Sequence, residues 1–331
     1  MAEYSEAREL GKALGIRRSW TNLTIIAEAL KRGIAVTAEQ EKPRIALTHN
    51  GITHRWGNGR NSLNSELSRR IGWYKDVQSR LFRNQGINAP ENAVFTSGQA
   101  ERAWQWAEPL GRLVVKPHDG THGKNVHVGI GAWEDFAYAF EHVAAYRDQV
   151  LVEKFLPGVE HRCLMVDHKL VAVTRRRPAS VFGDGTSTIA ELVERKNRRR
   201  GRIHKPIQLG DLERRHLGRK GRDFDTVPDE GRRVFLLGTS NIHAGGDAID
   251  ATTEVTADER TLIEEASLAV PGMRVVGLDV LLPRKGRGSE VTIIEANTAP
   301  MTSMHHFPWV GEKRNVSAPI LDAMFPETRS E

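Results

Sequence analysis

Two apolar runs near the end of the chain, VVGLDVLL and VTIIEA, each carry an acidic residue and flank a loop rich in proline, glycine and basic residues. A loop over residues 283–290 would close a β-hairpin centred near Arg287. Asp279 and Glu295 lie eight residues on either side of that centre, so we expect them to face each other across antiparallel strands. Asn297 shares the face of Glu295 because side chains alternate along a strand. The pattern predicts two carboxylates and one amide at one spot.

Helical and strand patterns alternate irregularly through the rest of the chain and divide it into three predicted parts. The first, residues 1–70, is a small N-terminal α/β region with the helix TIIAEALKRG, the strand PRIALTHNG and the polar loop HRWGNGRNS. The second, residues 71–160, has a helix around SRRIGWYKDVQSRLFRNQG, the strand LVVKP, a glycine loop, the strand VHVGI, the helix WEDFAYAFEHVAAY and the strand QVLVEKFL. The third, residues 161–331, combines an alternating β-pattern, a polar and basic insertion at 183–233, a helix at 258–270 and the hairpin. This order indicates an α+β fold with mixed sheets.

The composition is that of an ordinary globular protein, with 331 residues, 39% hydrophobic and 27% charged. The N-terminus is polar and no run approaches ~18 apolar residues, so we expect a cytoplasmic protein without a membrane span. The single cysteine, Cys163, excludes an internal disulfide, and its apolar setting favours a buried residue over a reactive thiol.

The net charge of +6 is concentrated in two basic runs, residues 195–205 and 212–222. Such runs are most often solvated faces, and attraction to an anionic ligand is the second interpretation. Binding of nucleic acid as the main function is disfavoured, because the runs lack interleaved aromatic residues and a recognition-helix pattern.

Acidic residues such as Asp279 and Glu295 are unusual in strands as apolar as these. Like charges that are buried together are unfavourable unless a cation lies between them, and no lysine or arginine is adjacent to them in sequence on that face. Carboxylate and amide oxygens suit Mg²⁺, which completes its coordination with water and substrate phosphates. The alternative is an edge hairpin with solvated acids.

Two further segments indicate a nucleotide. In LVVKPHDGTHGKNVHVGI, Lys116 ends a strand before a loop with Gly120 and Gly123, where backbone N–H groups and an ammonium can approach phosphate oxygens. The alternative is a β-hairpin with a glycine turn and one surface lysine. In VLVEKFLPGVEHRCLMV, Glu153 ends a strand beside an apolar platform and Glu160 follows a Pro-Gly turn, which suits an adenine edge and a ribose. Each acid alone would also suit an ordinary surface.

Taken together, these motifs resemble the ATP-grasp superfamily of carboxylate–amine ligases over about residues 70–310. Within it the resemblance is strongest to the ATP-grasp module of cyanophycin synthetases and of bifunctional glutathione synthetases. It is carried by KPHDGTHGKNV, EKFLPGVEHRCLMV, RRRPASVFGDGTSTIAELVERKN, NIHAGGDAIDAT and EANTAPMTS. The resemblance implies an ATP-grasp fold, in which two mixed α/β lobes clasp ATP between antiparallel sheets.

The resemblance also implies roles for individual residues. ATP would be bound by Lys75, Lys116, Gly120, Thr121, His122, Gly123, Lys124, Glu153, Lys154, Phe155, Leu156 and Glu160. The lysines Lys75 and Lys116 would contact phosphates, residues 153–156 the adenine, and Glu160 the ribose. Two Mg²⁺ ions, with Mn²⁺ as a substitute, would be held by Asp279, Glu295 and Asn297. Arg175, Asn241 and His243 would act close to the transferred phosphate.

Plain structural alternatives exist for the three residues assigned to catalysis. Arg175 lies on a basic strand that would also suit a solvated face. Asn241 and His243 lie in TSNIHAGGD, which would also form a capped turn before the helix at 258–270. Asn125 departs from the family pattern, because many relatives have a third glycine there, and we expect a stiffer loop over ATP.

The implied activity is an ATP-dependent ligation of a carboxylate to an amine through an acyl phosphate, with release of ADP and phosphate. No side-chain nucleophile is required. We expect small-molecule or peptide substrates, an amino acid or peptide as acid donor, no membrane partner, and no nucleic acid, and the sequence leaves a homo-oligomer open. Because no Mur-ligase-like module follows residue 331, we expect a stand-alone ligase rather than cyanophycin polymerisation. A non-catalytic ATP-binding subunit and an acid kinase without amine transfer are the alternatives.

Overall fold

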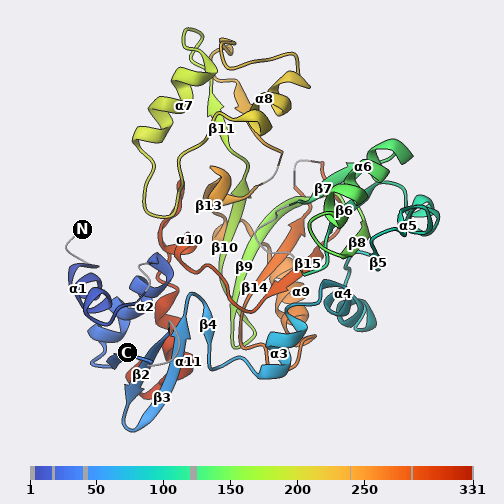
Figure 1. Cartoon of the computed structure of the whole chain (residues 1–331). Helices are drawn as coiled ribbons and strands as arrows, with labels where there is room; N and C mark the ends of the chain where they lie inside the picture. The colour runs from blue at the N-terminus through green and yellow to red at the C-terminus, as the bar shows by residue number, and fades with distance from the viewer. Residues whose placement is uncertain are drawn as a thin grey trace. The chain divides into compact units, whose positions relative to one another are not determined.

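A computed structural model describes residues 4–16, 19–39, 44–119, 125–238, 240–284 and 286–329 (Figure 1). The chain forms two compact units, which are described separately below. Unit 1 comprises Met1–Val173, Thr253–Thr302 and Val316–Glu331, and unit 2 comprises Thr174–Thr252 and Ser303–Asn315. Helices and antiparallel sheets are mixed in the chain, which confirms the predicted α+β class. The three-part division by sequence position stays a prediction.

The predicted hairpin lies in the main sheet of unit 1. Its strands are β14 (Val275–Leu282) and β15 (Thr292–Asn297), and β14 also pairs antiparallel with β9 (Val159–Val166). The next strand in the sheet is β10 (Lys169–Arg177), whose first five residues belong to unit 1. Asp167 and His168, between β9 and β10, both have positive φ (47° and 63°), as a tight two-residue hairpin turn requires. The carboxylates of the hairpin therefore lie on adjacent strands of one continuous sheet.

A second sheet of unit 1 contains the strands predicted around the glycine loop. Its order is β5 (Asn92–Thr96), β8 (Gln149–Lys154), β6 (Leu113–Pro117) and β7 (His127–Ile130), with antiparallel pairing throughout. The helices α5 (Ala100–Ala107) and α6 (Trp133–Ala144), with the short η2 (Glu108–Leu110), belong to the same region. The core of this region is fully buried and includes Leu113, Val115, Phe136, Phe140 and Val152. The predicted strands LVVKP, VHVGI and QVLVEKFL are confirmed, except that β7 begins at His127 and β8 ends at Lys154.

The N-terminal part of unit 1 has its own four-stranded antiparallel sheet. The strands are β1 (Ala35–Ala38), β2 (Ile45–His49), β3 (Ile52–Gly57) and β4 (Arg60–Asn61). The prediction of HRWGNGRNS as a polar loop is wrong, because HRWG completes β3 and RN forms β4. Most side chains of β3 are at least partly exposed, which gives the strand a polar sequence, although Trp56 is fully buried.

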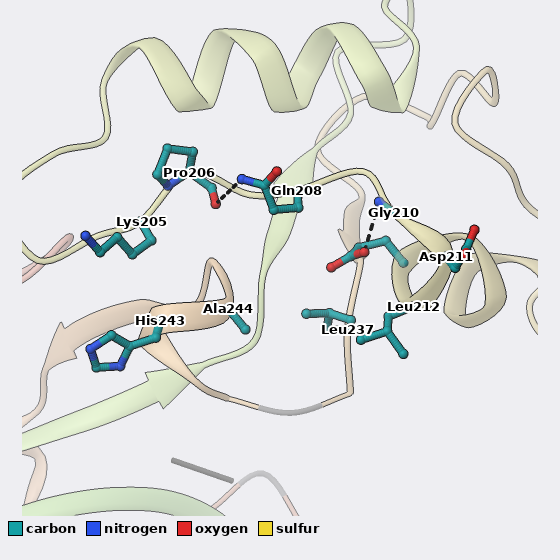
Figure 2. Close-up of a pocket in the computed structure, with 10 residues that line it drawn as sticks. Lys205, Pro206, Gln208, Gly210, Asp211, Leu212, Leu237, His243 and Ala244 are labelled. Carbon is teal, nitrogen blue, oxygen red and sulfur yellow. Dashed lines mark hydrogen bonds between the residues drawn. The ribbon is translucent and has the colours of Figure 1, made fainter. Parts of the chain in front are cut away.

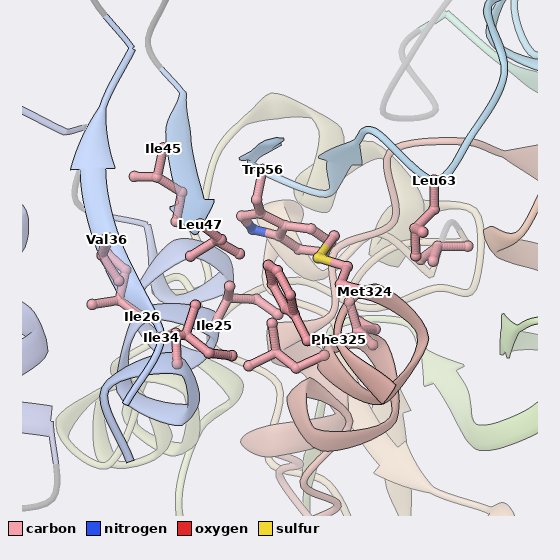
Figure 3. Packing of buried hydrophobic residues seen from close by; sticks show 14 of the residues in the cluster. Ile25, Ile26, Ile34, Val36, Ile45, Leu47, Trp56, Leu63, Met324 and Phe325 are labelled. Carbon is pink, nitrogen blue, oxygen red and sulfur yellow. The ribbon is translucent and has the colours of Figure 1, made fainter. Parts of the chain in front are cut away.

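The core beneath this sheet is built from both ends of the chain. Helices α1 (Ser5–Ala13), α2 (Trp20–Lys31) and α11 (Ser317–Met324), with η5 (Pro326–Thr328), accompany the sheet. Figure 3 shows side chains of α2, β2 and Trp56 of β3 gathered in one cluster with Met324 and Phe325 at the end of α11. The guanidinium of Arg32 donates to Asp322 with a distance of 2.7 Å between Nη1 and Oδ1. The N-terminal helices therefore pack against a helix almost 300 residues later in the chain.

The segment SRRIGWYKDVQSRLFRNQG forms two helices rather than the single helix that the sequence predicts. The helices are α3 (Glu66–Ile71) and α4 (Lys75–Asn84), separated by Gly72, Trp73 and Tyr74. A Cβ at Gly72 would lie 3.0–3.1 Å from the Thr298 side chain, so the break packs closely against the segment after β15. The break makes Lys75 the first residue of α4.

The side chain of Asn64, just before α3, ties this segment to the main sheet. Its Nδ2 donates to the carbonyls of Val275 (2.7 Å) and Thr298 (3.2 Å), and its Oδ1 accepts the N–H of Val275 (2.8 Å). Asn64 thereby connects the start of β14 with the end of β15. The helix α9 (Ala257–Leu268), which begins with the capping residue Thr256, also belongs to unit 1 and confirms the helix predicted at 258–270.

Unit 2 contains the basic insertion, which is a folded element with an apolar core. Its elements are β11 (Ser180–Phe182), α7 (Ile189–Arg198), α8 (Asp211–Gly218), β12 (Arg233–Phe235), η3 (Ile242–Ala244), β13 (Asp247–Asp250), η4 (Thr252–Glu254, shared with unit 1) and α10 (Ser303–His306). Val181, Ile189, Val193, Leu217 and Val234 are buried together. β13 pairs with the last four residues of β10, and β11 pairs with β12. Among the described residues, no helix combines the length and hydropathy needed to cross a membrane.

Candidate functional site

The β14–β15 hairpin has the register that the sequence predicts. Asp279 lies directly opposite Glu295, and Gly277 lies opposite Asn297. The register shifts after Asp279, so that Val280 pairs with Ile293. Because positions two apart on a strand share a face, the Asp279, Glu295 and Asn297 side chains share one face of the sheet. Asp279 is only 8% exposed, and therefore the alternative of a hairpin with solvated acids fails for this residue.

Arg162 neutralises Asp279, and the sequence analysis missed it. Arg162 is the partner of Asp279 on β9, on the side of β14 away from β15. Its Nε donates to Asp279 Oδ1 (2.5 Å) and its Nη2 to Oδ2 (3.0 Å), which makes a buried bidentate ion pair. Burial disfavours the charged guanidinium, but the attraction of Asp279 outweighs it and raises the pKa of Arg162. Separated by 117 residues, the pair leaves no signal in the local sequence.

Lys116 forms a second buried ion pair, with Glu153. The two side chains come from the adjacent strands β6 and β8, and the Lys116 Nζ lies 2.6 Å from Glu153 Oε1. Lys116 is 6% exposed and Glu153 4% exposed. β6 and β7 pair antiparallel, as the structural alternative predicts. That alternative also predicts that Lys116 lies on the surface, which is wrong because the residue is buried. Because the Lys116 ammonium is buried and already paired with a carboxylate, it is a positive charge held in a fixed position rather than a solvated surface charge.

Lys75 adds a second ammonium to the same cluster. Its Nζ donates to the backbone carbonyl of His118, 3.3 Å away, and the residue is 8% exposed. Burial lowers the pKa of Lys75, the nearby Glu295 opposes this, and Lys116 lowers the pKa further. The same electrostatic interactions include Glu153. The structure therefore brings together four of the predicted site residues, two lysines and two glutamates, from α4, β6, β8 and β15.

A network around His118 links the helix that carries Lys75 to the strand that carries Lys116. The ring Nε2 lies 2.6 Å from Asp76 Oδ1 and Nδ1 lies 2.9 Å from Gln149 Oε1, while the ring packs on Tyr74 with 5.6 Å between centroids. None of these supporting residues was predicted. The available signal was position, because Asp76 follows one predicted phosphate lysine and His118 lies two residues after the other.

Gln78 fixes α4 against the hairpin strand. Its Oε1 accepts the N–H of Ala296, between Glu295 and Asn297, at 2.6 Å. Its Nε2 donates to the carbonyls of Ile71 (3.3 Å) and Gly72 (3.0 Å), where α3 ends. A single buried amide therefore sets the position of the Lys75 helix relative to two of the three predicted metal ligands.

The glycine loop lies mostly outside the described residues. The predicted ATP contacts Gly120, Thr121, His122, Gly123 and Lys124 all fall in that segment. Asn125, the first described residue after it, has a φ of 54°, a left-handed conformation that asparagine tolerates better than most residues. Asparagine at this position therefore preserves a backbone conformation that glycine adopts without strain.

The remaining predicted nucleotide contacts follow the end of β8. Lys154 is exposed and ends β8, and the Phe155 N–H donates to the carbonyl of Arg112 at 2.7 Å. Phe155, Leu156 and Glu160 are half-buried, and Glu160 pairs with Leu281 across β9 and β14. These residues therefore lie at the end of β8 and the start of β9, and their contacts with adenine and ribose stay predictions.

The three predicted catalytic residues belong to unit 2, so they are placed only within it. Arg175 is half-buried on β10 opposite Ile249. Asn241 caps the turn η3 by accepting the N–H of His243 on Oδ1 at 2.9 Å, as the capped-turn alternative predicts, although the turn precedes β13 rather than α9. A Cβ at Gly246 would lie 2.8 Å from the carbonyl oxygen of Asn241 and 2.9 Å from that of Arg177, which only glycine permits.

His243 lines a cavity of about 610 Å³ in unit 2 (Figure 2). Polar groups of Lys205, Gln208 and Asp211 and the apolar side chain of Leu237 lie around the same cavity. This volume falls in the range of about 300–1,000 Å³ that holds small molecules and short peptide segments. The turn that carries Asn241 and His243 is therefore adjacent to a cavity of small-molecule size.

The hairpin oxygens fit a hard divalent cation. In the described part of the chain no three His, Cys, Asp or Glu side chains form a metal-binding group, so a site here depends on two carboxylates and the Asn297 amide. Asn297 Oδ1 accepts the N–H of Ala299 at 2.9 Å, and both Asp279 oxygens accept from Arg162. Because each of these oxygens has a second lone pair, these hydrogen bonds leave acceptor capacity for Mg²⁺. Cys163 is not a competing ligand, because burial raises the pKa of its thiol.

Comparison with known proteins finds relatives that are much longer than this chain. Cyanophycin synthetase from Trichormus variabilis is 32% identical over 317 residues, which cover 92% of this chain and 35% of the relative. The bifunctional glutathione biosynthesis protein of Mannheimia succiniciproducens is 34% identical over 281 residues, covering 80% of this chain and 37% of the relative. The crystal structure of a bifunctional glutathione synthetase from Pasteurella multocida superimposes with a TM-score of 0.70 at 30% identity, over 93% of this chain and 43% of that one.

The chain therefore has the ATP-grasp fold. No family model matches it. D-alanine–D-alanine ligase from Bacillus anthracis, at 18% identity and a TM-score of 0.50, shares the fold over 80% of this chain and 70% of that one. ATP-grasp ligases in general use ATP and Mg²⁺. The chain spans about a third of the length of the curated relatives that it matches.

Proposed function

We propose that the chain is an ATP-dependent carboxylate–amine ligase that activates an acid as an acyl phosphate. The observation that carries the proposal is the cluster in unit 1. Two buried lysines lie together here: Lys75 interacts electrostatically with Glu153 and Glu295, and Lys116 is paired with Glu153. Glu295 lies opposite Asp279 across the hairpin. Cations beside oxygen ligands are what a triphosphate with a divalent metal requires.

Each site residue has a role in this proposal. Asp279, Glu295 and Asn297 hold two Mg²⁺ ions, which Mn²⁺ replaces, and the metal supplies neutralisation of charge on the phosphate oxygens. Lys75 and Lys116 bind phosphates, together with the loop at residues 120–124. The segment from Glu153 to Leu156 binds adenine and Glu160 the ribose. Because an ammonium has three donors, Lys116 can retain Glu153 while it binds a phosphate oxygen.

The reaction has two steps. An oxygen of the acid attacks the γ-phosphorus of ATP, the bond to ADP breaks, and an acyl phosphate forms. An amine then attacks the acyl carbon, the carbon–oxygen bond to phosphate breaks, and the amine loses a proton to give the amide. Arg175, Asn241 and His243 stabilise the transferred phosphate, and the cavity beside His243 holds substrate. The acid is an amino acid or a peptide. A cytoplasmic location and a homo-oligomer stay predictions from the sequence.

The decisive experiment is a coupled ADP-release assay across amino acids and dipeptides, with mass spectrometry of every positive mixture. Glu295→Gln should reduce ADP formation at least ~100-fold, because positioning and charge neutralisation supply most of the catalysis. Glu312→Gln, which changes an exposed side chain of the same type, is the matched control. Turnover by Glu295→Gln close to that of the control would contradict the metal assignment.

The same assay separates the alternatives. ADP that forms with the acid alone, at the same rate with and without an amine, would indicate an acid kinase. No ADP with any pool, while ATP still binds, would indicate a non-catalytic subunit. Lys116→Met should weaken ATP binding, whereas Lys169→Met, which removes an exposed lysine paired with Glu264 at 3.0 Å, should not. Equal ATP affinities for the two variants would remove Lys116 from the phosphate site.

A further inference from the structure

A second, smaller pocket of unit 2 is lined by an unusual number of cations. Its volume is about 260 Å³, and its lining includes Arg177 from β10, Arg195, Lys196 and Arg199 from the end of α7, Ser180 and Trp309. The other lining side chains are apolar. No carboxylate lines this pocket among the described residues. Four positive groups around one small volume add up to a positive electrostatic potential inside it. This potential attracts an anion.

The carboxylate behind the pocket is already shared among three cations. Asp247, which is fully buried, accepts from Arg200 (Nη1–Oδ1 2.8 Å), from Lys196 (Nζ–Oδ2 2.8 Å) and from Arg177 (Nη2–Oδ2 3.1 Å). Arg200 also donates to the carbonyls of Gly245 and Gly246, at 2.9 and 2.7 Å. One buried negative charge therefore faces one fully buried and two half-buried positive charges, and the pocket side of this cluster keeps a positive surplus.

The pKa of Lys196 depends on burial and on charges of both signs around it. Burial lowers the pKa of Lys196, Asp247 raises it, and Arg200 and Arg177 lower it again. The ring of Trp309 is a second feature of the pocket. Its centroid lies 5.5 Å from the Lys196 Nζ, 5.3 Å from the Arg200 Cζ and 5.9 Å from the Arg199 Cζ. An anion bound here would relieve the repulsion among the cations, and the ring would contact any carbon portion of the ligand.

Arg199 is the pocket cation best placed to bind an external anion. Arg195 pairs with Asp184 (2.6 Å), and Arg177 and Lys196 share Asp247. In the described part of the chain, Arg199 has no carboxylate partner and contacts the ring of Trp309. A guanidinium presents a fork of N–H donors that matches a carboxylate.

We propose that this pocket binds a small organic polycarboxylate, a molecule with two or more carboxylates on a short carbon stem. The cations come from two elements, β10 and α7, which suits two anionic groups rather than one. The Trp309 ring and the apolar lining suit a carbon stem, which inorganic phosphate lacks. The volume, below the range for drug-sized ligands, suits a molecule of about amino-acid size. The site is additional to the nucleotide and metal site and does not depend on the ligase reaction.

The test is isothermal titration calorimetry of the full chain without ATP, at a constant ionic strength of about 0.15 M. The probes are glutarate and citrate, with acetate as the single-charge control and inorganic phosphate as the anion without a carbon stem. Saturable binding of glutarate or citrate, at least ~10-fold tighter than acetate and phosphate, is expected. No saturable binding of either polycarboxylate, or phosphate binding as tight as citrate, would overturn the proposal.

A matched pair of variants on one helix locates the site. Arg199→Gln should weaken citrate binding at least ~10-fold, because it removes a guanidinium without exposing a buried carboxylate. Arg198→Gln removes the neighbouring arginine, which is exposed, is paired with Glu194 and does not line the pocket, and should change affinity less than ~2-fold. Equal losses for the two variants would show unspecific attraction to a basic surface and reject the pocket.

Two further measurements keep the outcome clear. Trp309→Leu should weaken citrate binding and leave acetate binding unchanged, while an unchanged citrate affinity would reject the role of the ring. ATP binding and ADP release of Arg199→Gln are measured in parallel. Loss of citrate binding with normal ATP binding supports a separate site, whereas failure of the ligase assay in the wild type leaves the citrate result intact.

Discussion

The two units bury ionised side chains in different ways. Unit 1 gives two of its buried cations a carboxylate each, Lys116 with Glu153 and Arg162 with Asp279. Unit 2 places three cations on the single carboxylate of Asp247. A one-to-one pair is close to neutral and can accept a ligand that carries both signs, such as a nucleotide with its metal. A three-to-one cluster has a positive surplus and favours an anion alone.

The largest effect is expected from neutralising the shared carboxylate in unit 2. Asp247→Asn keeps the shape but leaves Arg200, whose side chain is fully buried, with two other cations and no counter-charge. We expect a loss of about 3–5 kcal/mol in the free energy of unfolding, which is typical when a buried ionic partner is removed. Urea denaturation followed by tryptophan fluorescence measures it. Asp184→Asn, at an exposed pair with Arg195, should shift the midpoint far less, and equal shifts would contradict the comparison.

A smaller effect is expected from removing the cation of a pair in unit 1. Arg162→Met leaves Asp279 buried without its partner, and we expect a loss of about 3 kcal/mol without divalent ions. Saturating Mg²⁺ should recover part of this loss, because a ligand that binds only the folded state stabilises it. Arg274→Met is the matched control, since Arg274 makes an equally short bidentate pair with Asp167 at the surface. Its loss should be within ~1 kcal/mol and insensitive to Mg²⁺. An Mg²⁺-independent loss for Arg162→Met would contradict the metal site.

The smallest effect is a pH dependence in unit 2. Burial, followed by the charge of Arg200, lowers the pKa of His204 from 6.5 to about 4, although Asp247 opposes the shift. The unfolded chain therefore takes up a proton at a higher pH than the folded chain. Stability is complete above pH 6.5 and is lost as the pH falls toward 4, by about 2 kcal/mol between pH 7 and pH 5.

Comparing variants isolates this contribution. His204→Gln should flatten the decline in the free energy of unfolding between pH 7 and pH 5, because glutamine does not titrate and its oxygen can accept the Ala248 N–H that His204 Nε2 accepts at 3.3 Å. The same slope in His204→Gln as in the wild type would show that His204 titrates normally.

The sequence predicted those features that depend on local periodicity. The Asp279–Glu295 register followed from counting residues on either side of a glycine-rich loop, and Lys116 was placed at a strand end by the apolar run before it. The ion pairs could not be predicted, because Arg162 and Asp279 meet only when β9 becomes the neighbour of β14. β3 was missed since most of its side chains are at least partly exposed and polar, which conceals the alternation of a half-buried strand.

The helix break before Lys75 shows a different limit. The predicted single helix ran through Gly72, although glycine is unfavourable inside a helix, so the sequence did contain a local signal for the break. The close approach of Gly72 to Thr298 is a tertiary contact that the sequence does not show.

The packing of α11 against α2 and β2 has a consequence for the order of folding during synthesis. Most chains assemble their N-terminal structure while the ribosome is still translating. Here the apolar faces of α2 and β2 are covered by Met324 and Phe325, which are synthesised only after the whole of the intervening chain. This core is therefore completed late in translation, after the strands and helices between its two halves have been made.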